Sequence, residues 1–318
     1  LIAVLCGQCG NYGLTPKHSS FAAHSLVIGH FIEGGYYPKG GADQICHKTL
    51  KTINKHGGEI FIRARVDEIV ITNNKTQGVR IGNKFIPCKS VISNVGVNNT
   101  FQNLIRKNIY DLSDLESSHA HMCLYVGLDV SDEEIDLPKH NLWYYENENL
   151  DELVESITLE NSTSKFAYIS FPSKKDPLWN KKNPGTATIQ ALTIGKMEWF
   201  KEFQDSKWKQ RGDAYLQMKN DFEKNMLEKL YELFPQIKGH VVETEVSSPL
   251  STKHFSNYSH GEIYGLAHNK KRFKADFLRP ETKVKGLRLV GQDVTLVGVS
   301  GAMMSGLLCA ITILKFNI

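Results

Sequence analysis

The stretch that decides the fold is Gly286-Leu-Arg-Leu-Val-Gly-Gln-Asp-Val-Thr-Leu-Val-Gly-Val-Ser-Gly301, near the end of the 318-residue chain. A short apolar run ending at Val290 has the length of a buried strand. Gly291 ends that run, Asp293 follows it, and the small residues Gly298, Ser300 and Gly301 precede an apolar helical pattern. A strand, a lone acid, a glycine-rich turn and a helix N-terminus together form an arrangement that binds dinucleotides. In such a site the acid accepts hydrogen bonds from sugar or ribityl hydroxyls.

The same region has a second interpretation. The 21 residues from Val294 to Leu314 carry no charge, and a stretch of this length is long enough for a helix that crosses a bilayer. Pairs of small residues such as Gly301 and Ser305 have the spacing of a transmembrane packing face. Glycines, serines and threonines dilute the apolarity, however, and Asp293 stands at the boundary. The pattern alone leaves open a spanning helix or a helix packed against a cofactor.

Motifs elsewhere in the chain decide between these alternatives. The C-terminal stretch resembles the last flavin motif of the phytoene desaturase, carotenoid isomerase and retinol saturase group of FAD-dependent oxidoreductases. Gly35–Gly41 and Val91–Asn94 resemble two further motifs of that group, in the same order. The run before the final strand matches at Ser248-Pro-Leu250, Gly261-Glu-Ile-Tyr-Gly265 and Arg279-Pro280, and segments 171–177 and 198–200 resemble the retinol saturase branch.

The resemblance implies an α/β fold of mixed helices and strands. It would be an FAD/NAD(P)-binding, Rossmann-like flavoprotein of the glutathione-reductase and amine-oxidase type, with a β-meander and an inserted mixed substrate domain. We expect a helical part of the substrate or lid region at 1–34 and a flavin-domain helix and meander at 35–97. A substrate-binding domain would cover 98–285, and the C-terminal flavin-binding strand and helix 286–318.

The resemblance also assigns candidate residues to the cofactor. Those expected to contact FAD are Gly40, Gly41, Val66, Asn94, Gly291, Asp293, Gly298, Gly301 and Ala302. No catalytic residue is assigned, but Tyr36, Tyr37 and Lys39 are the nearest candidate proton donors by family position. No metal site is expected: Cys6 and Cys9 form a lone Cys-x-x-Cys pair without a second pair of ligands.

The implied activity is hydride exchange between FAD and a conjugated, apolar polyene, either a retinoid or a carotenoid, with NAD(P)H as electron donor. Saturation of a retinol double bond is the main expectation; carotenoid isomerisation and phytoene-desaturase-like oxidation are alternatives. A membrane-anchored or flavin-free module without catalysis is another. We expect association with a membrane surface, that of the endoplasmic reticulum if the source is eukaryotic. The stretch 294–314 should be buried in the protein and not cross the bilayer.

Composition narrows the classes of partner. The net charge of +4 is mild, and the basic run Lys270–Lys274 is interpreted as a solvated loop, so nucleic acid is not expected. The six cysteines do not suggest a disulfide framework. No G-x-G-x-x-G occurs, although a flavoprotein of this type should open with one, which predicts that the chain is the C-terminal part of a longer protein.

Periodicity predicts the main elements. The first half should contain a helix at about 42–56, followed by three strands at 59–71, 78–81 and 85–93 with turns between them. Further along, the chain should contain strands at 122–128, 142–145, 166–171 and 186–192. An amphipathic helix is predicted over 213–234, with apolar residues on one stripe and Pro235 at its end.

Overall fold

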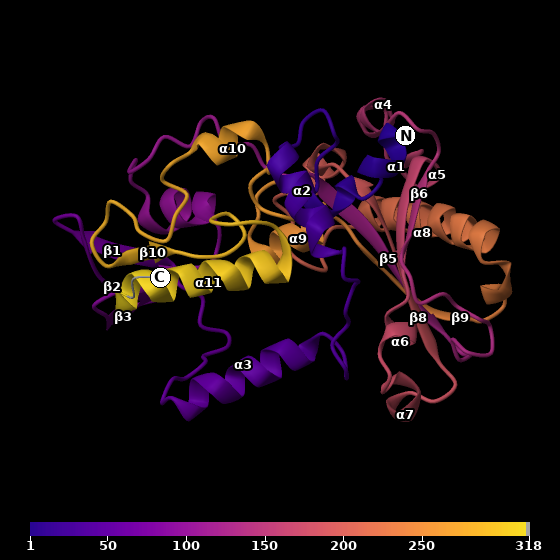
Figure 1. The fold of residues 1–318 in the computed structure, drawn as a ribbon, viewed down its shortest axis with the longest axis horizontal. Coiled ribbons are helices and arrows are strands. Elements are labelled where there is room, and N and C mark those ends of the chain that lie inside the picture. Colours follow the sequence, from indigo (N-terminus) through magenta and orange to yellow (C-terminus); the bar gives the residue numbers. More distant parts are fainter. Residues whose placement is uncertain (316–318) are drawn as a thin grey trace. The chain divides into compact units, whose positions relative to one another are not determined.

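A computed structural model describes residues 1–315, and these residues form two compact units (Figure 1). Unit 1 consists of Leu1–Gln8, Ile28–Ile60 and Ala120–His254. Unit 2 consists of Cys9–Val27, Phe61–His119 and the described chain from Phe255 onward. Each unit is therefore built from three separate segments of the chain. The assignment of four functional segments from sequence stays a prediction, because compactness does not test it.

Unit 1 contains a five-stranded antiparallel sheet in the order β6-β7-β8-β5-β9. Its strands are β5 (Ala120–Leu128), β6 (Leu142–Tyr145), β7 (Phe166–Ser170), β8 (Ala187–Gly195) and β9 (Val241–Ser247). The first four match the predicted strands to within a few residues. Strand β9 was not predicted, because charged and polar residues hold most of its positions and its sequence does not alternate.

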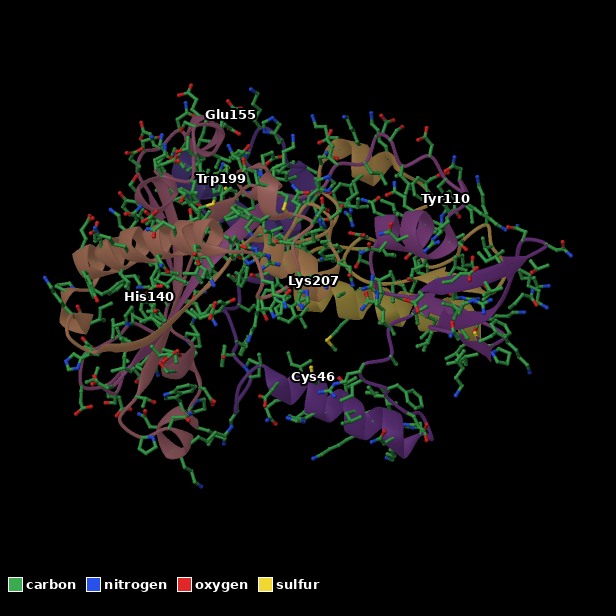
Figure 2. The ribbon with its side chains drawn as sticks, turned by 180° about the vertical axis from the view of Figure 1, so that it is seen from behind. Cys46, Tyr110, His140, Glu155, Trp199 and Lys207 are labelled. Carbon is green, nitrogen blue, oxygen red and sulfur yellow. The ribbon has the colours of Figure 1, made fainter. Side chains whose placement is uncertain are left out.

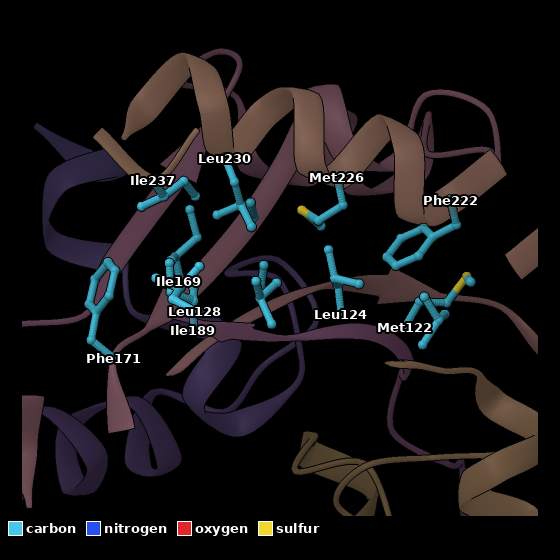
Figure 3. Packing of buried hydrophobic residues seen from close by; sticks show 14 of the residues in the cluster. Met122, Leu124, Leu128, Ile169, Phe171, Ile189, Phe222, Met226, Leu230 and Ile237 are labelled. Carbon is cyan, nitrogen blue, oxygen red and sulfur yellow. The ribbon is translucent and has the colours of Figure 1, made fainter. Parts of the chain in front are cut away.

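Helix α8 (Asp213–Leu233) confirms the predicted amphipathic helix, and its apolar stripe packs against this sheet. Phe222, Met226 and Leu230 point from the helix toward side chains of the strands, among them Leu124 and Ile169 (Figure 3). The helix ends at Leu233, because the next position leads into Pro235, which cannot continue the backbone hydrogen bonds. Burial of this stripe provides the main core of unit 1.

The remaining helices within unit 1 are short, apart from α3 (Asp43–Lys55), which confirms the helix predicted at about 42–56. The short α-helices are α1 (Ile2–Cys6), α4 (Leu150–Glu155), α5 (Ser162–Lys165), α6 (Pro172–Lys175) and α7 (Trp179–Lys182), and the 3-10 helices are Met197–Phe203 and Pro235–Ile237. Two helices contain a boundary between the units, α2 (Phe21–His30) and α9 (Pro249–Ser256).

Unit 2 contains a β-meander of β1 (Glu68–Thr72), β2 (Lys75–Ile81) and β3 (Lys84–Pro87). Asn73 and Asn74 both have positive φ and form the predicted two-residue turn. Two predictions were wrong here. The first strand begins only at Glu68, and the stretch predicted as one strand at 85–93 forms two strands in different sheets.

The second of those strands, β4 (Val91–Ser93), pairs in parallel with β10 (Leu287–Leu289). The chain leaves the meander after the Cys88 N–H, which still donates to the Gln77 carbonyl oxygen. Three residues later the Val91 N–H donates to the carbonyl oxygen of Gly286, at the start of the C-terminal motif. This parallel pair places the motif beside Asn94.

A second core stabilises unit 2. Its buried residues are Ile69, Val97, Phe101, Ile105, Leu266, Val284, Leu287 and Leu289. Val97, Phe101 and Ile105 belong to a segment that includes a π-helical turn, Asn99–Ile105. At the edge of this core Tyr110, labelled in Figure 2, stacks on Phe277 with ring centroids 4.5 Å apart. The other elements are a 3-10 helix (Cys9–Tyr12), α10 (Lys270–Lys274) and α11 (Gly298–Leu314).

Helix α11 corrects the expectation that residues 294–314 are buried. Only Ser305 and Cys309 of the helix are buried, whereas Met303 and Leu307 are more than half exposed. One face packs on unit 2, where the Arg288 side chain donates to Thr312 Oγ1, and the opposite apolar face lies open in the described chain. Among residues 1–315, no helix is both long enough and apolar enough to cross a membrane.

Replacing Leu230 by Ala should lower the free energy of unfolding by about 2–5 kcal/mol, because a fully buried side chain leaves a cavity. Leu216→Ala is the matched control, since Leu216 lies on the same helix but is 52% exposed, and it should cost less than about 0.5 kcal/mol. Urea unfolding followed by circular dichroism measures both. Equal losses would contradict the packing of α8 on the sheet.

Candidate cofactor site

The site begins where β10 ends. Val290 donates its N–H to the Ser93 carbonyl oxygen, and the next residue, Gly291, has a φ of +102°. A Cβ at Gly291 would lie 2.2 Å from Asn94 Oδ1, so a side chain would collide with the asparagine. Glycine at 291 therefore allows both the turn and the close approach of Asn94.

Asp293 of the motif is buried, with only 3% of the residue exposed, and both of its carboxylate oxygens are hydrogen-bonded. Its Oδ2 accepts the N–H of Val97 at 2.9 Å, and its Oδ1 accepts the N–H of Leu266 at 2.9 Å. Burial raises the pKa of the carboxyl, while these two hydrogen bonds and the Arg272 guanidinium act in the opposite direction. The carboxylate thus joins three distant segments of unit 2.

Two glycines provide the space for this carboxylate. Gly265 has a φ of +65°, and a Cβ there would lie 2.4 Å from Asp293 Oδ1. Gly96 has a φ of +88°, and a Cβ there would lie 3.0 Å from the Tyr258 ring and 3.2 Å from Asp293 Oδ2. A side chain at Gly265 would collide with the carboxylate, and one at Gly96 would press on it and on the Tyr258 ring from a backbone conformation that favours glycine.

The loop between Asp293 and α11 is held from both sides. Arg272 is buried on α10, and its guanidinium donates to the carbonyl oxygens of Gln292 and Thr295 at 2.8 and 2.7 Å. The interpretation of residues 270–274 as a solvated loop was therefore wrong for Arg272, whose charge is satisfied by backbone carbonyls. On the helix side, the Gly291 N–H donates to Ser305 Oγ at 2.6 Å.

These contacts shape a partly open cavity of about 200 Å³, lined by Asn94, Gly96, Tyr258, Val290, Gly291, Gln292, Asp293 and Ala302. Four of the predicted cofactor residues, Asn94, Gly291, Asp293 and Ala302, are thus brought together. Gly298 and Gly301 lie in the first turn of α11, and a Cβ at Gly301 would lie 2.1 Å from the Leu296 carbonyl oxygen. Val66 is half-buried just before β1 and does not line this cavity.

The candidate cofactor residues from sequence did not include four lining residues, Gly96, Tyr258, Val290 and Gln292. The Gln292 amide donates to the Tyr258 hydroxyl at 3.2 Å, which leaves the hydroxyl proton of Tyr258 available for a ligand. Gln292 could have been inferred from its place beside Asp293. No local pattern marks Tyr258, which reaches the cavity only through the tertiary fold.

The other predicted residues belong to unit 1. Gly40 and Gly41 have φ values of +94° and +100° and precede α3. Tyr36 is 92% exposed, Lys39 is exposed, and Tyr37 is 36% exposed. The pKa of Tyr37 is raised, first by burial and then by the negative charges of Asp176 and Asp43. Tyr37 therefore stays a neutral phenol, the form that can donate a proton.

The cavity lining suits one part of FAD. Complete ligand pockets commonly measure about 300–1,000 Å³, so this space would hold a portion of a dinucleotide. An amide, a phenol and a carboxylate with lone pairs remaining can all hydrogen-bond a polyhydroxylated chain such as the ribityl group. Among the described residues, no group of side chains is placed to hold a metal ion.

Comparison with solved structures defines the fold. The chain aligns along 99% of its length with an oxidoreductase from Methanosarcina mazei, at a TM-score of 0.62, 16% identity and 64% coverage of that structure. It also aligns along 87% with putrescine oxidase bound to putrescine, at a TM-score of 0.56, 14% identity and 54% coverage. The fold is that of the FAD-dependent oxidoreductases, and the predicted fold class is confirmed.

Sequence comparison identifies the relatives within that class. The chain is similar over its whole length to all-trans-retinol 13,14-reductase of Danio rerio, at 35% identity, and covers 56% of that protein. A phytoene desaturase (lycopene-forming) of Pseudescherichia vulneris is 27% identical over 54% of the chain and 39% of its own length. The predicted relationship to the retinol saturase and phytoene desaturase group is confirmed.

Two further findings qualify the comparison. An inactive all-trans-retinol 13,14-reductase of Danio rerio is 29% identical over 95% of the chain, which covers 53% of that protein. No family model matches the chain. The chain spans about half the length of the curated relatives it matches.

Asp293→Ala should lower the free energy of unfolding of unit 2 by about 2–4 kcal/mol even without flavin, because two buried N–H groups lose their acceptor and water recovers only part of the loss. Asp276→Ala is the control, since the Asp276 side chain is 89% exposed. Chemical unfolding of flavin-free protein measures both. A loss no larger than that of the control would show that Asp293 does not hold the segments together.

Gly265→Ala should be more destabilising than Gly82→Ala, although both glycines have positive φ. At Gly82 a Cβ would meet nothing within 4 Å, so that change reports backbone strain alone, whereas at Gly265 it would collide with Asp293 Oδ1. We expect an additional loss of about 1–3 kcal/mol for Gly265→Ala, the usual range for overpacking. Thermal unfolding of the two variants checks this, and indistinguishable midpoints would contradict the close approach.

Proposed function

We propose that the complete protein is an FAD-dependent oxidoreductase that exchanges hydride with a conjugated polyene and saturates a double bond of retinol. The observation that carries this proposal is the C-terminal motif around Asp293, assembled into a polar cavity in a chain that is 35% identical to all-trans-retinol 13,14-reductase over its whole length. FAD, when bound, supplies the hydride chemistry, and the protein supplies binding, orientation and a proton.

The residues of the chain divide these tasks. Asp293, Asn94, Gln292 and Tyr258 would hold the ribityl part of the cofactor from the cavity lining. The N–H groups that begin α11 at Gly298, together with Gly301 and Ala302, would face the flavin where it carries partial negative charge. The positive φ values of Gly40 and Gly41 and the absence of side chains there would let backbone lie against the flat ring.

Saturation of a double bond also needs a proton. Tyr37 is the best placed of the three sequence candidates, because it is far less exposed than Tyr36 and a phenol carries its proton at neutral pH. Its raised pKa makes it a weaker acid than an exposed tyrosine, so the reaction would have to supply the driving force for the transfer. Tyr36 and Lys39 are exposed and are weaker candidates. We assign Tyr37 as the proton donor to be tested first.

Unit 1 offers a surface for an apolar substrate. Strands β6 and β7 carry half-buried aromatic side chains, and the rings of Trp143 and Tyr168 lie 4.5 Å apart. We propose that such side chains contact the polyene. The exposed apolar residues Phe21 and Leu26 on α2 and Ile32 after it support peripheral contact with a membrane, that of the endoplasmic reticulum in a eukaryote. NAD(P)H is proposed as the source of electrons.

Two alternatives follow from the relatives. Similarity to phytoene desaturase favours a carotenoid substrate, either oxidised or isomerised, because desaturation and saturation are one hydride step in opposite directions. Similarity to an inactive reductase favours a flavin-free or non-catalytic protein. The experiment must therefore separate reaction, direction and loss of activity.

The complete protein, reduced anaerobically with dithionite or with NAD(P)H, should convert all-trans-retinol to a dihydro product two mass units heavier. A poly-cis carotenoid is offered in parallel, and products are separated by chromatography and mass spectrometry. An isomerised carotenoid of unchanged mass, with no reaction of retinol, would move the assignment to isomerisation. A colourless protein that leaves both substrates unchanged would favour the non-catalytic alternative.

A further inference from the structure

The backbone of Gly40 is held on both sides by side chains far away in sequence. The buried Gly40 donates its N–H to Asp176 Oδ1 at 2.8 Å, and its carbonyl oxygen accepts Lys182 Nζ at 3.0 Å. All three residues belong to unit 1. These two hydrogen bonds restrict the backbone of Gly40 to one conformation. Its φ is positive, so other residues would be strained at this position.

Asp176 is itself rigidly placed. It is 7% exposed and follows α6, and its Oδ1 also accepts the N–H of Leu178 at 3.0 Å. Helix α6 is in turn attached to the sheet, because the Thr188 N–H on β8 donates to Ser173 Oγ at 3.0 Å. The anchor on Gly40 is therefore continuous with the core of unit 1.

The same carboxylate acts on a neighbouring residue of the loop. Asp176 is one of the two negative charges, with Asp43, that raise the pKa of Tyr37, after the larger effect of burial. The loop from Tyr37 to Gly41 thus carries both the candidate proton donor and the candidate flavin-facing glycines. A fixed position of Gly40 relative to Asp176 would set the position of all of them.

We propose that Asp176 and Lys182 are positioning residues, which hold Gly40 by its N–H and its carbonyl group and so fix the Tyr37–Gly41 loop for the hydride step. The inference rests on the proposed function, since it takes this loop to lie against the flavin. Segment 171–177 would then support the reaction through the hydrogen bond from Gly40 to Asp176, a role that the resemblance alone did not give it.

The test compares Asp176→Ala with Asp132→Ala in the complete protein. Asp132 is a matched control, because it is also buried and lies 3.6 Å from Lys174 of α6 but does not bond Gly40. Hydrogen–deuterium exchange of a peptide covering residues 33–44 should show the Gly40 amide exchanging at least about 10-fold faster in Asp176→Ala only. Asp176→Asn, which keeps an oxygen acceptor, should restore most of the protection.

The kinetic arm measures single-turnover reoxidation of the reduced enzyme by all-trans-retinol. Asp176→Ala should lower the rate constant of this step at least about 10-fold, with little change in the retinol concentration that gives half the maximal rate. Asp132→Ala should leave the rate constant unchanged. Lys182→Met should slow it less, and Lys181→Met, a neighbouring exposed lysine on α7, should leave it unchanged.

The outcomes separate this inference from the proposed function. If the unmodified protein does not react with retinol, the proposed function fails, and exchange still tests the tether on Gly40. Equal exchange at Gly40 in Asp176→Ala and Asp132→Ala overturns the tether whatever the activity. Faster exchange with an unchanged rate of reoxidation overturns the positioning role in the reaction.

Discussion

The paired hydrogen bonds from Val97 and Leu266 to the Asp293 carboxylate are the constraint on which unit 2 depends. They connect the segment after β4, the segment before α10 and the motif after β10 at one buried point. Such a carboxylate costs desolvation, which is why its pKa is raised, and the two hydrogen bonds together with the Arg272 charge make its burial tolerable. The glycines at 96 and 265 exist beside it because any larger residue would displace an oxygen or the Tyr258 ring.

Unit 1 uses the same device at a different place. Asp176 is also buried and also accepts two backbone N–H groups, from Gly40 and Leu178. In both units a carboxylate therefore fixes loops that carry glycines with positive φ, and those loops contain most of the candidate cofactor residues. Loops have few apolar contacts of their own, so charge-assisted hydrogen bonds are an effective way to give them one conformation.

Features written locally in the sequence could be predicted. The strand, acid and helix around Asp293, the turn at Asn73 and the apolar stripe of α8 were all predicted and observed. What depends on distant partners could not. Nothing near Arg272 indicates that loop carbonyls will bury it, and nothing in residues 85–93 tells that Val91 leaves the meander to pair with Leu287. The open face of α11 was missed because apolar composition does not reveal which residues a neighbour covers.

The pairing of β4 with β10 also bears on the order in which the protein is made. Leu287 can meet Val91 only after the intervening chain has been synthesised, whereas every strand of the unit 1 sheet is complete once Ser247 has emerged. The five-stranded sheet can therefore form before β10 is made, and during that time the edge of β4 that pairs with β10 has no partner strand. Pairings this distant in sequence form slowly, and an unpaired strand edge beside an apolar segment is open to wrong pairing, so the interval before Leu287 is made is when residues 91–105 are most exposed to aggregation.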